Sequence, residues 1–154
     1  MLTRFEVFIR PDLVDAAGEG LIKDIEDLNI KGAKDARIIR VTEIEGDISK
    51  KDAKRIASEL LADPVSQRYV IGRVSGDMTK GAYVIEVHFN HGVTDAVAES
   101  TLKGIGDMGI QGAVGAKTAT KVVLRGKLSA DQVDTISKKL LANAVIQSYS
   151  IEKK

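Results

Sequence analysis

The chain is an internal duplication. Sliding the sequence by 80 residues aligns residues 4–74 with residues 84–154 without a gap, and 22 of the 71 aligned pairs are identical. The identities keep one register through charged, apolar and glycine positions, which chance agreement between apolar residues does not produce. Two copies of one unit therefore make up the chain. The matched residues include Glu6 with Glu86, Asp15 with Asp95, Ile25 with Ile105, Gly46 with Gly126, and Tyr69 with Tyr149.

The join between the copies is polar and contains two glycines. Residues 73–81 read Arg-Val-Ser-Gly-Asp-Met-Thr-Lys-Gly, between a first unit over 1–72 and a second unit over 82–154. At roughly 3.3 Å per residue, such a linker reaches about 30 Å, which is enough to cross the face of a small domain. We therefore expect the two units to pack beside each other.

Each unit predicts the element order β-α-β-α-β. The opening residues 4–10 alternate apolar and polar side chains, which is typical of a half-buried strand. Apolar residues then recur at helical spacing from Val14 to Leu28, and Asp15 is suited to cap this helix. The other expected elements are a strand over 34–45 that ends at Gly46, a helix that follows Ser49, and a closing strand over 65–71, each with a counterpart 80 residues later.

The size of the unit bears on the architecture. A domain of about 70 residues buries only some 60% of the surface of its unfolded chain, so it is marginally stable alone. The second unit can cover the apolar surface that a single unit would leave exposed. We therefore predict an α+β fold in which two ferredoxin-like units pack about a pseudo-twofold axis, as the subunits of a homodimer would.

Composition excludes several classes of function. Lys and Arg number 23 and Asp and Glu 22, and aromatic residues make up 4%, so nucleic acid is not an expected partner. The chain has no cysteine, which removes disulfides, thiolate nucleophiles and cysteine-ligated zinc. No segment has the apolar length of a signal peptide or a membrane span. We expect a soluble, cytoplasmic protein that does not bind membranes.

Three short motifs suggest ligands but have the wrong context. The glycines of Gly104-Ile-Gly106-Asp-Met-Gly109 match a dinucleotide fingerprint, yet the repeat places them at the end of a helix, with Gly109 as a C-cap. Residues 112–118 resemble a phosphate loop but lead into a strand. His88 and His91 lack a third metal ligand. We therefore expect no metal and no cofactor.

No catalytic residue is expected either. The chain has no G-x-S-x-G motif, and two histidines three residues apart do not build a Ser-His-Asp group. The repeated carboxylates at Asp15/Asp95 and Glu19/Glu99 are explained by positions at helix N-termini. A chain that catalyses a reaction by itself is thus disfavoured.

The closing segments carry a family resemblance. Residues 61–69, Leu-Ala-Asp-Pro-Val-Ser-Gln-Arg-Tyr, and residues 141–149, Leu-Ala-Asn-Ala-Val-Ile-Gln-Ser-Tyr, both resemble the PurS signature, close to L-A-N-P-V-I-E-x-Y. Residues 14–19 and 36–40 are similar to the start of the family's first helix and to its V-R-x-G-K strand. The copies depart differently, since the first has Asp63 and Ser66, and the second has Ala144, where the signature has Asn, Ile and Pro.

The resemblance implies a function that composition and spacing do not. PurS is the small subunit of phosphoribosylformylglycinamidine synthase, and the present chain looks like a covalently joined PurS dimer. Family members bridge a PurL synthetase and a PurQ glutaminase in this ATP- and glutamine-dependent ligase complex of purine biosynthesis, without catalytic residues of their own. The implied partner-binding candidates are Asp15, Arg37, Arg40, Asp63, Tyr69, Asn143 and Tyr149.

Two other readings stay open. A tandem ACT-type regulatory module would also consist of paired α+β units, and it would bind an amino acid at their interface. A stand-alone enzyme would require a pocket that brings His88 or His91 to a repeated carboxylate. In the PurS-like reading the chain is a monomeric pseudo-dimer or a low homo-oligomer.

Overall fold

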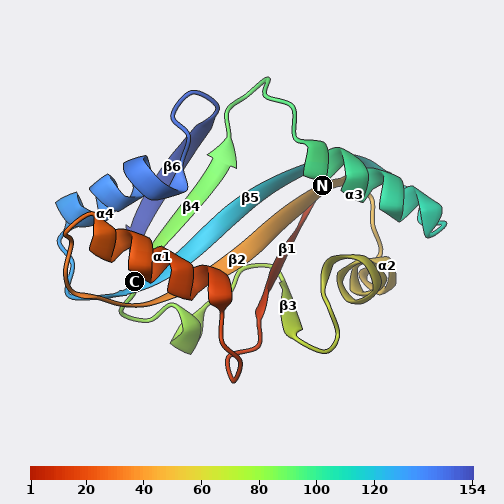
Figure 1. Ribbon diagram of the computed structural model, residues 1–154. Coiled ribbons are helices and arrows are strands. Elements are labelled where there is room, and N and C mark those ends of the chain that lie inside the picture. Colours follow the sequence, from red (N-terminus) through yellow and green to blue (C-terminus); the bar gives the residue numbers. More distant parts are fainter.

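One antiparallel sheet runs through both halves of the chain. The computed structural model describes residues 1–154, and each half has the predicted order β-α-β-α-β (Figure 1). The first half contains β1 (Leu2–Ile9), α1 (Ala16–Asp27), β2 (Ala33–Gly46), α2 (Lys50–Arg55) continued by the π-helical η1 (Ile56–Leu61), and β3 (Gln67–Ile71). The second contains β4 (Tyr83–Phe89), α3 (Ala96–Asp107), β5 (Ala113–Gly126), α4 (Ala130–Ile136) continued by η3 (Ser137–Leu141), and β6 (Gln147–Lys153).

The strand order shows the predicted pseudo-twofold symmetry. The sheet has the order β3-β1-β2-β5-β4-β6, so each half places its first strand between its other two. The halves join where β2 pairs with β5 along most of their length, and Arg40 lies opposite Thr120. These two residues are 80 positions apart and therefore equivalent in the repeat. The pseudo-twofold axis passes between them.

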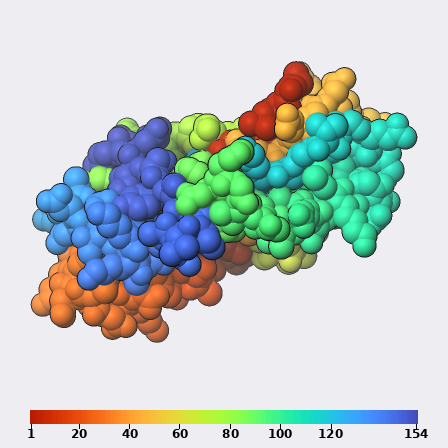
Figure 2. Space-filling view, turned by 90° about the horizontal axis from the view of Figure 1, so that it is seen from above, coloured from red at the N-terminus to blue at the C-terminus, as the bar shows by residue number.

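The helices of one half pack on those of the other. All four cover the same face of the sheet, where α1 lies beside α4 at one end and α3 beside η1 at the other (Figure 1). In Figure 2 the colours of the two halves accordingly lie against each other at both ends of the molecule. The α1–α4 core consists of Leu21, Ile25, Ile30, Ala36, Ile85, Val87, Val122, Leu124, Val133 and Ile136. The α2–α3 core consists of Phe5, Ile44, Ala53, Ile56, Ala57, Ile105 and Ile110.

The linker covers part of the opposite face. Residues 72–82 include a 3-10 turn, η2 (Gly76–Met78), and bury Val74 over a third cluster that contains Phe8, Ile39, Val41, Ala82 and Val123. Arg125 fixes this segment, because its guanidinium donates to the carbonyl oxygens of Asp77, Met78 and Lys80. The join is therefore a packed part of the fold.

Two details of the predicted elements were wrong. Val14 lies outside the first helix and is 68% exposed, since Asp15 caps that helix and α1 begins at Ala16. The closing strands begin at Gln67 and Gln147, so Val65 and Val145 lie in turns. The side chains of Asp63 and Asn143 accept hydrogen bonds from the backbone N–H groups of these valines, which bends the chain before each strand.

The helix termini follow the predicted signals. Ser129 and Gln132 form a complete capping box, whereas Ser49 accepts the Asp52 N–H without the reciprocal bond. After α3, Gly109 has a φ of 79°, the left-handed conformation expected of a residue that ends a helix. None of the helices has the length and apolar character needed to cross a membrane.

Candidate functional site

Asp15 and Asp95 tie each first helix to the neighbouring strand. One carboxylate oxygen of Asp15 accepts the N–H of Gly18 at 3.1 Å, and the other accepts the N–H of Ile38 in β2 at 2.8 Å. Asp95 accepts the equivalent bonds from Ala98 and Thr118. Asp15 is only 6% exposed. Its capping role accounts for its hydrogen bonds and leaves little of its surface for a partner.

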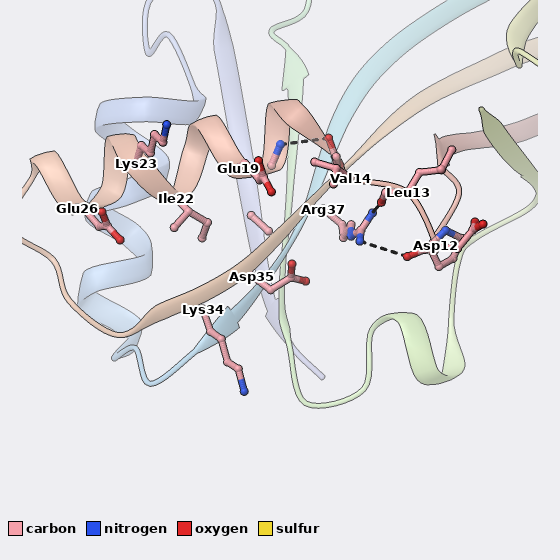
Figure 3. Close-up of a pocket in the computed structure, with 14 residues that line it drawn as sticks. Asp12, Leu13, Val14, Glu19, Ile22, Lys23, Glu26, Lys34, Asp35 and Arg37 are labelled. Carbon is pink, nitrogen blue, oxygen red and sulfur yellow. Dashed lines mark hydrogen bonds between the residues drawn. The ribbon is translucent and has the colours of Figure 1, made fainter. Parts of the chain in front are cut away.

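Arg37 holds the loop that precedes α1. Its guanidinium donates to the carbonyl oxygens of Leu13 at 3.0 Å and Pro11 at 3.4 Å. Figure 3 shows Arg37 directed at this loop, on the wall of an open pocket of about 600 Å³ between α1 and β2. The lining carries charges of both signs, with five acidic and three basic residues. They are Asp12, Asp15, Glu19, Glu26 and Asp35, and Lys23, Lys34 and Arg37.

The second half has an equivalent pocket of about 690 Å³. It lies between α3 and β5, and Lys117 takes the place of Arg37 there. His88 and His91 line this pocket together with the repeated carboxylates Asp95 and Glu99, which is the juxtaposition that a stand-alone enzyme would require. Both carboxylate oxygens of Asp95 already accept backbone N–H groups. No group of three or more His, Cys, Asp or Glu side chains in the chain is arranged to hold a metal ion.

Arg40 lies on the pseudo-twofold axis. Its guanidinium donates to the carbonyl oxygen of Leu61 at 2.9 Å, which connects the central strand β2 to the end of η1, where the first closing motif begins. The equivalent position in the second half is Thr120, which has no such reach. Arg40 therefore donates a side-chain hydrogen bond to the closing motif of its own half.

Asp63 and Asn143 stabilise the two equivalent turns. Each side chain accepts the N–H of a valine two residues later, at 2.8 and 3.1 Å. The backbone N–H of Asp63 donates to the side-chain oxygen of Gln67 at 2.7 Å, and that of Asn143 donates to Gln147 at 2.8 Å. These bonds present Val65 and Val145 at the tips, where they are 75% and 84% exposed.

The two tyrosines differ in their surroundings. The hydroxyl of Tyr149 donates to Asp134 at 2.5 Å, and Lys138 lies 3.0 Å from the other oxygen of that carboxylate. The hydrogen bond from Tyr149 lowers the pKa of Asp134, and the same bond raises the pKa of Tyr149. Tyr69 is 37% exposed and makes no side-chain hydrogen bond, because Lys54 occupies the place of Asp134.

The seven candidate residues do not form one site. Tyr69 lies on the edge strand β3 and Tyr149 on the opposite edge strand β6, while Arg40 lies at the centre of the sheet. Asp15 and Arg37 line a common pocket. The closing motifs instead form two separate surfaces, one at each edge of the sheet.

Sequence reasoning missed a buried ionic cluster on the sheet face away from the helices. Glu6 is fully buried and accepts from Lys121 at 2.9 Å, from Arg4 at 2.8 Å and from the Val74 N–H at 2.8 Å. Arg4 also binds Glu86, the repeat equivalent of Glu6. Burial raises the pKa of Glu6, but these hydrogen bonds outweigh it, and the pKa is lowered. The repeat marked Glu6 and Glu86 as matched, but Arg4 and Lys121, which bind Glu6, correspond to Val84 and Val41 in the other half.

Comparison with known proteins assigns the family. The family model of PurS, described as phosphoribosylformylglycinamidine (FGAM) synthase, matches residues 3–75 and matches again over residues 82–154. The two matches fall on the two halves of the sheet. A comparison with curated proteins found no match.

Proposed function

Since this chain belongs to the PurS family, we propose that it is the small, non-catalytic subunit of FGAM synthase and that it bridges a PurL-like synthetase and a PurQ-like glutaminase. FGAM synthase is an enzyme of purine biosynthesis. The observation that carries the proposal is the double family match, in which one chain supplies two PurS units. In this arrangement the covalent join replaces the association of two separate subunits.

Two equivalent but non-identical tips support a bridging role. Val65 and Val145 are exposed at turns that precede opposite edge strands, so one chain presents an apolar contact at each end of the sheet. The neighbouring residues differ, Asp63, Pro64 and Ser66 at one tip and Asn143, Ala144 and Ile146 at the other. Equivalent surfaces that have diverged suit two different partners. The candidates Asp63 and Tyr69 would belong to one contact, and Asn143 and Tyr149 to the other.

Reconstitution tests the proposal. The purified chain is added to a PurL-like synthetase and a PurQ-like glutaminase, and glutamine-dependent formation of FGAM is compared with the activity supported by free ammonia. We expect the chain to restore the glutamine-dependent reaction and to co-purify with both subunits in the presence of glutamine and ADP. If the mixture that contains the chain forms FGAM from free ammonia but not from glutamine, the bridging role is contradicted.

The tips provide a matched pair of variants. Val65→Asp and Val145→Asp each place a charge on a side chain that is already exposed, so the fold is expected to be retained. Each variant should weaken co-purification of one subunit and leave the other bound, and the two variants should affect different subunits. Wild-type binding of both subunits by both variants would exclude the tips as the contacts.

A further inference from the structure

The α2–α3 end of the molecule contains a pocket with several hydroxyl-bearing side chains in its lining. It lies between the centre of the sheet and α3, has a volume of about 340 Å³, and opens beside the pseudo-twofold axis. Hydroxyl groups dominate its polar lining, and Arg40 lies at its rim. We call it the threonine pocket, after Thr42, Thr101, Thr118 and Thr120, which line it together with Ser100.

The repeat provides an internal reference for this pocket. The positions equivalent to Thr42, Thr101 and Thr118 are Val122, Leu21 and Ile38, which pack in or against the α1–α4 core. The position equivalent to Ser100 is Gly20. Four hydroxyl groups at one end thus correspond to none at the other. The α1–α4 end shows that the same elements pack well without hydroxyl groups at these positions. Packing alone therefore does not explain the threonines.

Thr42 has an unused hydroxyl directed at the pocket. The residue is only 8% exposed, and its hydroxyl makes no hydrogen bond within the chain, although Thr118 and Thr101 bond to Asp95 and to the Val97 carbonyl. No fully enclosed polar side-chain atom lacks a partner, so the Thr42 hydroxyl is reached from the pocket. The Thr42 hydroxyl is therefore a free hydrogen-bond donor at the pocket surface, and valine at this position would offer none.

The charge of the lining identifies the class of ligand. Arg40 is the one charged residue that lines the pocket, and only one of its donors, to the Leu61 carbonyl, is in use. No lining carboxylate is present to bind an ammonium group or a cation. The volume lies at the low end of the range of about 300–1,000 Å³ for small-molecule sites. A guanidinium with several hydroxyls matches the acceptor oxygens of a small anion.

We propose that the threonine pocket binds a small anion through a phosphate or carboxylate group, with Arg40 and the hydroxyls of Thr42 and Thr120 as donors. The site is made from both halves of the chain, since β2 and η1 come from the first and α3 and β5 from the second. At the α1–α4 end, Val122, Leu21 and Ile38 stand where Thr42, Thr101 and Thr118 stand here, so we expect no anion to bind there. The proposal is independent of the contacts with the synthetase and the glutaminase.

Titration of the full chain tests the proposal. Inorganic phosphate, succinate and L-glutamate are added separately, and binding is followed by calorimetry and by shifts of the backbone amide signals of Thr42 and Thr120. Binding of phosphate or of succinate supports the proposal and identifies the preferred group. Binding of glutamate alone would mean that an ammonium group is recognised, as in an ACT-type module, and would overturn it, as would binding of none of the three.

Variants locate the site. Arg40→Thr and Thr42→Val install the residues of the equivalent positions Thr120 and Val122, and we expect them to weaken anion binding about tenfold and about fivefold, respectively. Lys51→Ala removes an exposed charge outside the lining and should leave binding unchanged. If Thr42→Val raises the melting temperature while anion binding stays at the wild-type level, Thr42 is only a core residue and the proposal fails.

Discussion

The two ends of the sheet have the same elements but different interiors. The α1–α4 core has ten buried apolar residues, and the α2–α3 core has seven. The difference arises at equivalent positions, where Leu21 and Val122 at one end correspond to Thr101 and Thr42 at the other. The end that packs fewer apolar side chains is the end that contains the threonine pocket.

This difference follows from joining two units in one chain. In a homodimer both ends have the same sequence, so any change made for a site at one end is repeated at the other. In the fused chain the copies change separately. The ionic cluster shows the same freedom, because Arg4 and Lys121 have valines, Val84 and Val41, at their equivalent positions. One end can therefore specialise while the other retains a filled core.

The largest expected effect comes from the matched isoleucines Ile25 and Ile105. Both side chains are fully buried, one in each core. We expect Ile25→Ala to lower the free energy of unfolding by about 4 kcal/mol and Ile105→Ala by about 3 kcal/mol, since the wall beside the pocket can relax into the space. Urea denaturation measures both values. A larger loss for Ile105→Ala would contradict the difference between the two cores.

Substitutions of the matched carboxylates Glu6 and Glu86 are expected to lower the free energy of unfolding by less than those of the isoleucines. Glu6→Gln removes the charge that Lys121 and Arg4 share, and because its side chain is fully buried we expect a loss of about 2 kcal/mol. The Glu86 side chain is 22% exposed, so water replaces part of its interaction and Glu86→Gln should cost less. If urea denaturation at pH 7 gives equal losses of unfolding free energy for Glu6→Gln and Glu86→Gln, the difference in burial has no effect on their stability.

The lowered pKa of Glu6 predicts how stability depends on pH. The unfolded chain binds this proton near the usual pKa of 4.5, and the folded chain binds it only at lower pH. The stabilisation is therefore complete above about pH 5 and is lost as the pH falls through the pKa of the folded state. Denaturation of the wild type between pH 7 and pH 3 should show this decline, with a smaller slope for Glu6→Gln. An unchanged slope in the variant would assign the decline to other carboxylates.

The smallest expected effect concerns the matched tyrosines. Tyr149 donates to Asp134, which raises the pKa of its phenol, while Tyr69 makes no side-chain hydrogen bond. In a spectrophotometric titration, Tyr149→Phe should remove a phenol that ionises above the usual pH of a tyrosine. Tyr69→Phe is the control and should leave that transition in place. Loss of the same transition in Tyr69→Phe would show that the exposed Asp134 bond does not persist in solution.

Much of the fold was predictable because the repeat doubled every local signal. Each weak pattern occurred twice in one register, so the strand before Asp15 and the helix after Ser49 were supported by their counterparts. The register also fixed the symmetry, which the pairing of Arg40 with Thr120 confirmed. The error at Val65 and Val145 had a local cause, since alternation predicts a strand wherever apolar residues alternate, and the hydrogen bonds of Asp63 and Asn143 turn the chain first.

The sites were harder to predict because they depend on contacts between the halves. Glu6 and Lys121 are 115 residues apart in the chain, and no spacing rule connects them. The threonine pocket likewise combines Thr42 with Thr101, and each looks like an ordinary core threonine until the sheet places them together. The unit boundaries at 1–72 and 82–154 stay predictions. So do the partner-binding assignments of Asp15, Arg37, Arg40, Asp63, Tyr69, Asn143 and Tyr149.

Separating the halves tests most directly whether the chain is one fold built from two interlocked units. Residues 1–75 and 82–154 are produced as two polypeptides and examined alone and mixed, by sedimentation and by the dispersion of their amide signals. Because each core contains side chains from both halves, we expect neither polypeptide alone to form a folded monomer, and we expect the mixture to give a one-to-one complex with the spectrum of the intact chain. A stable, folded monomer of either half would contradict this account.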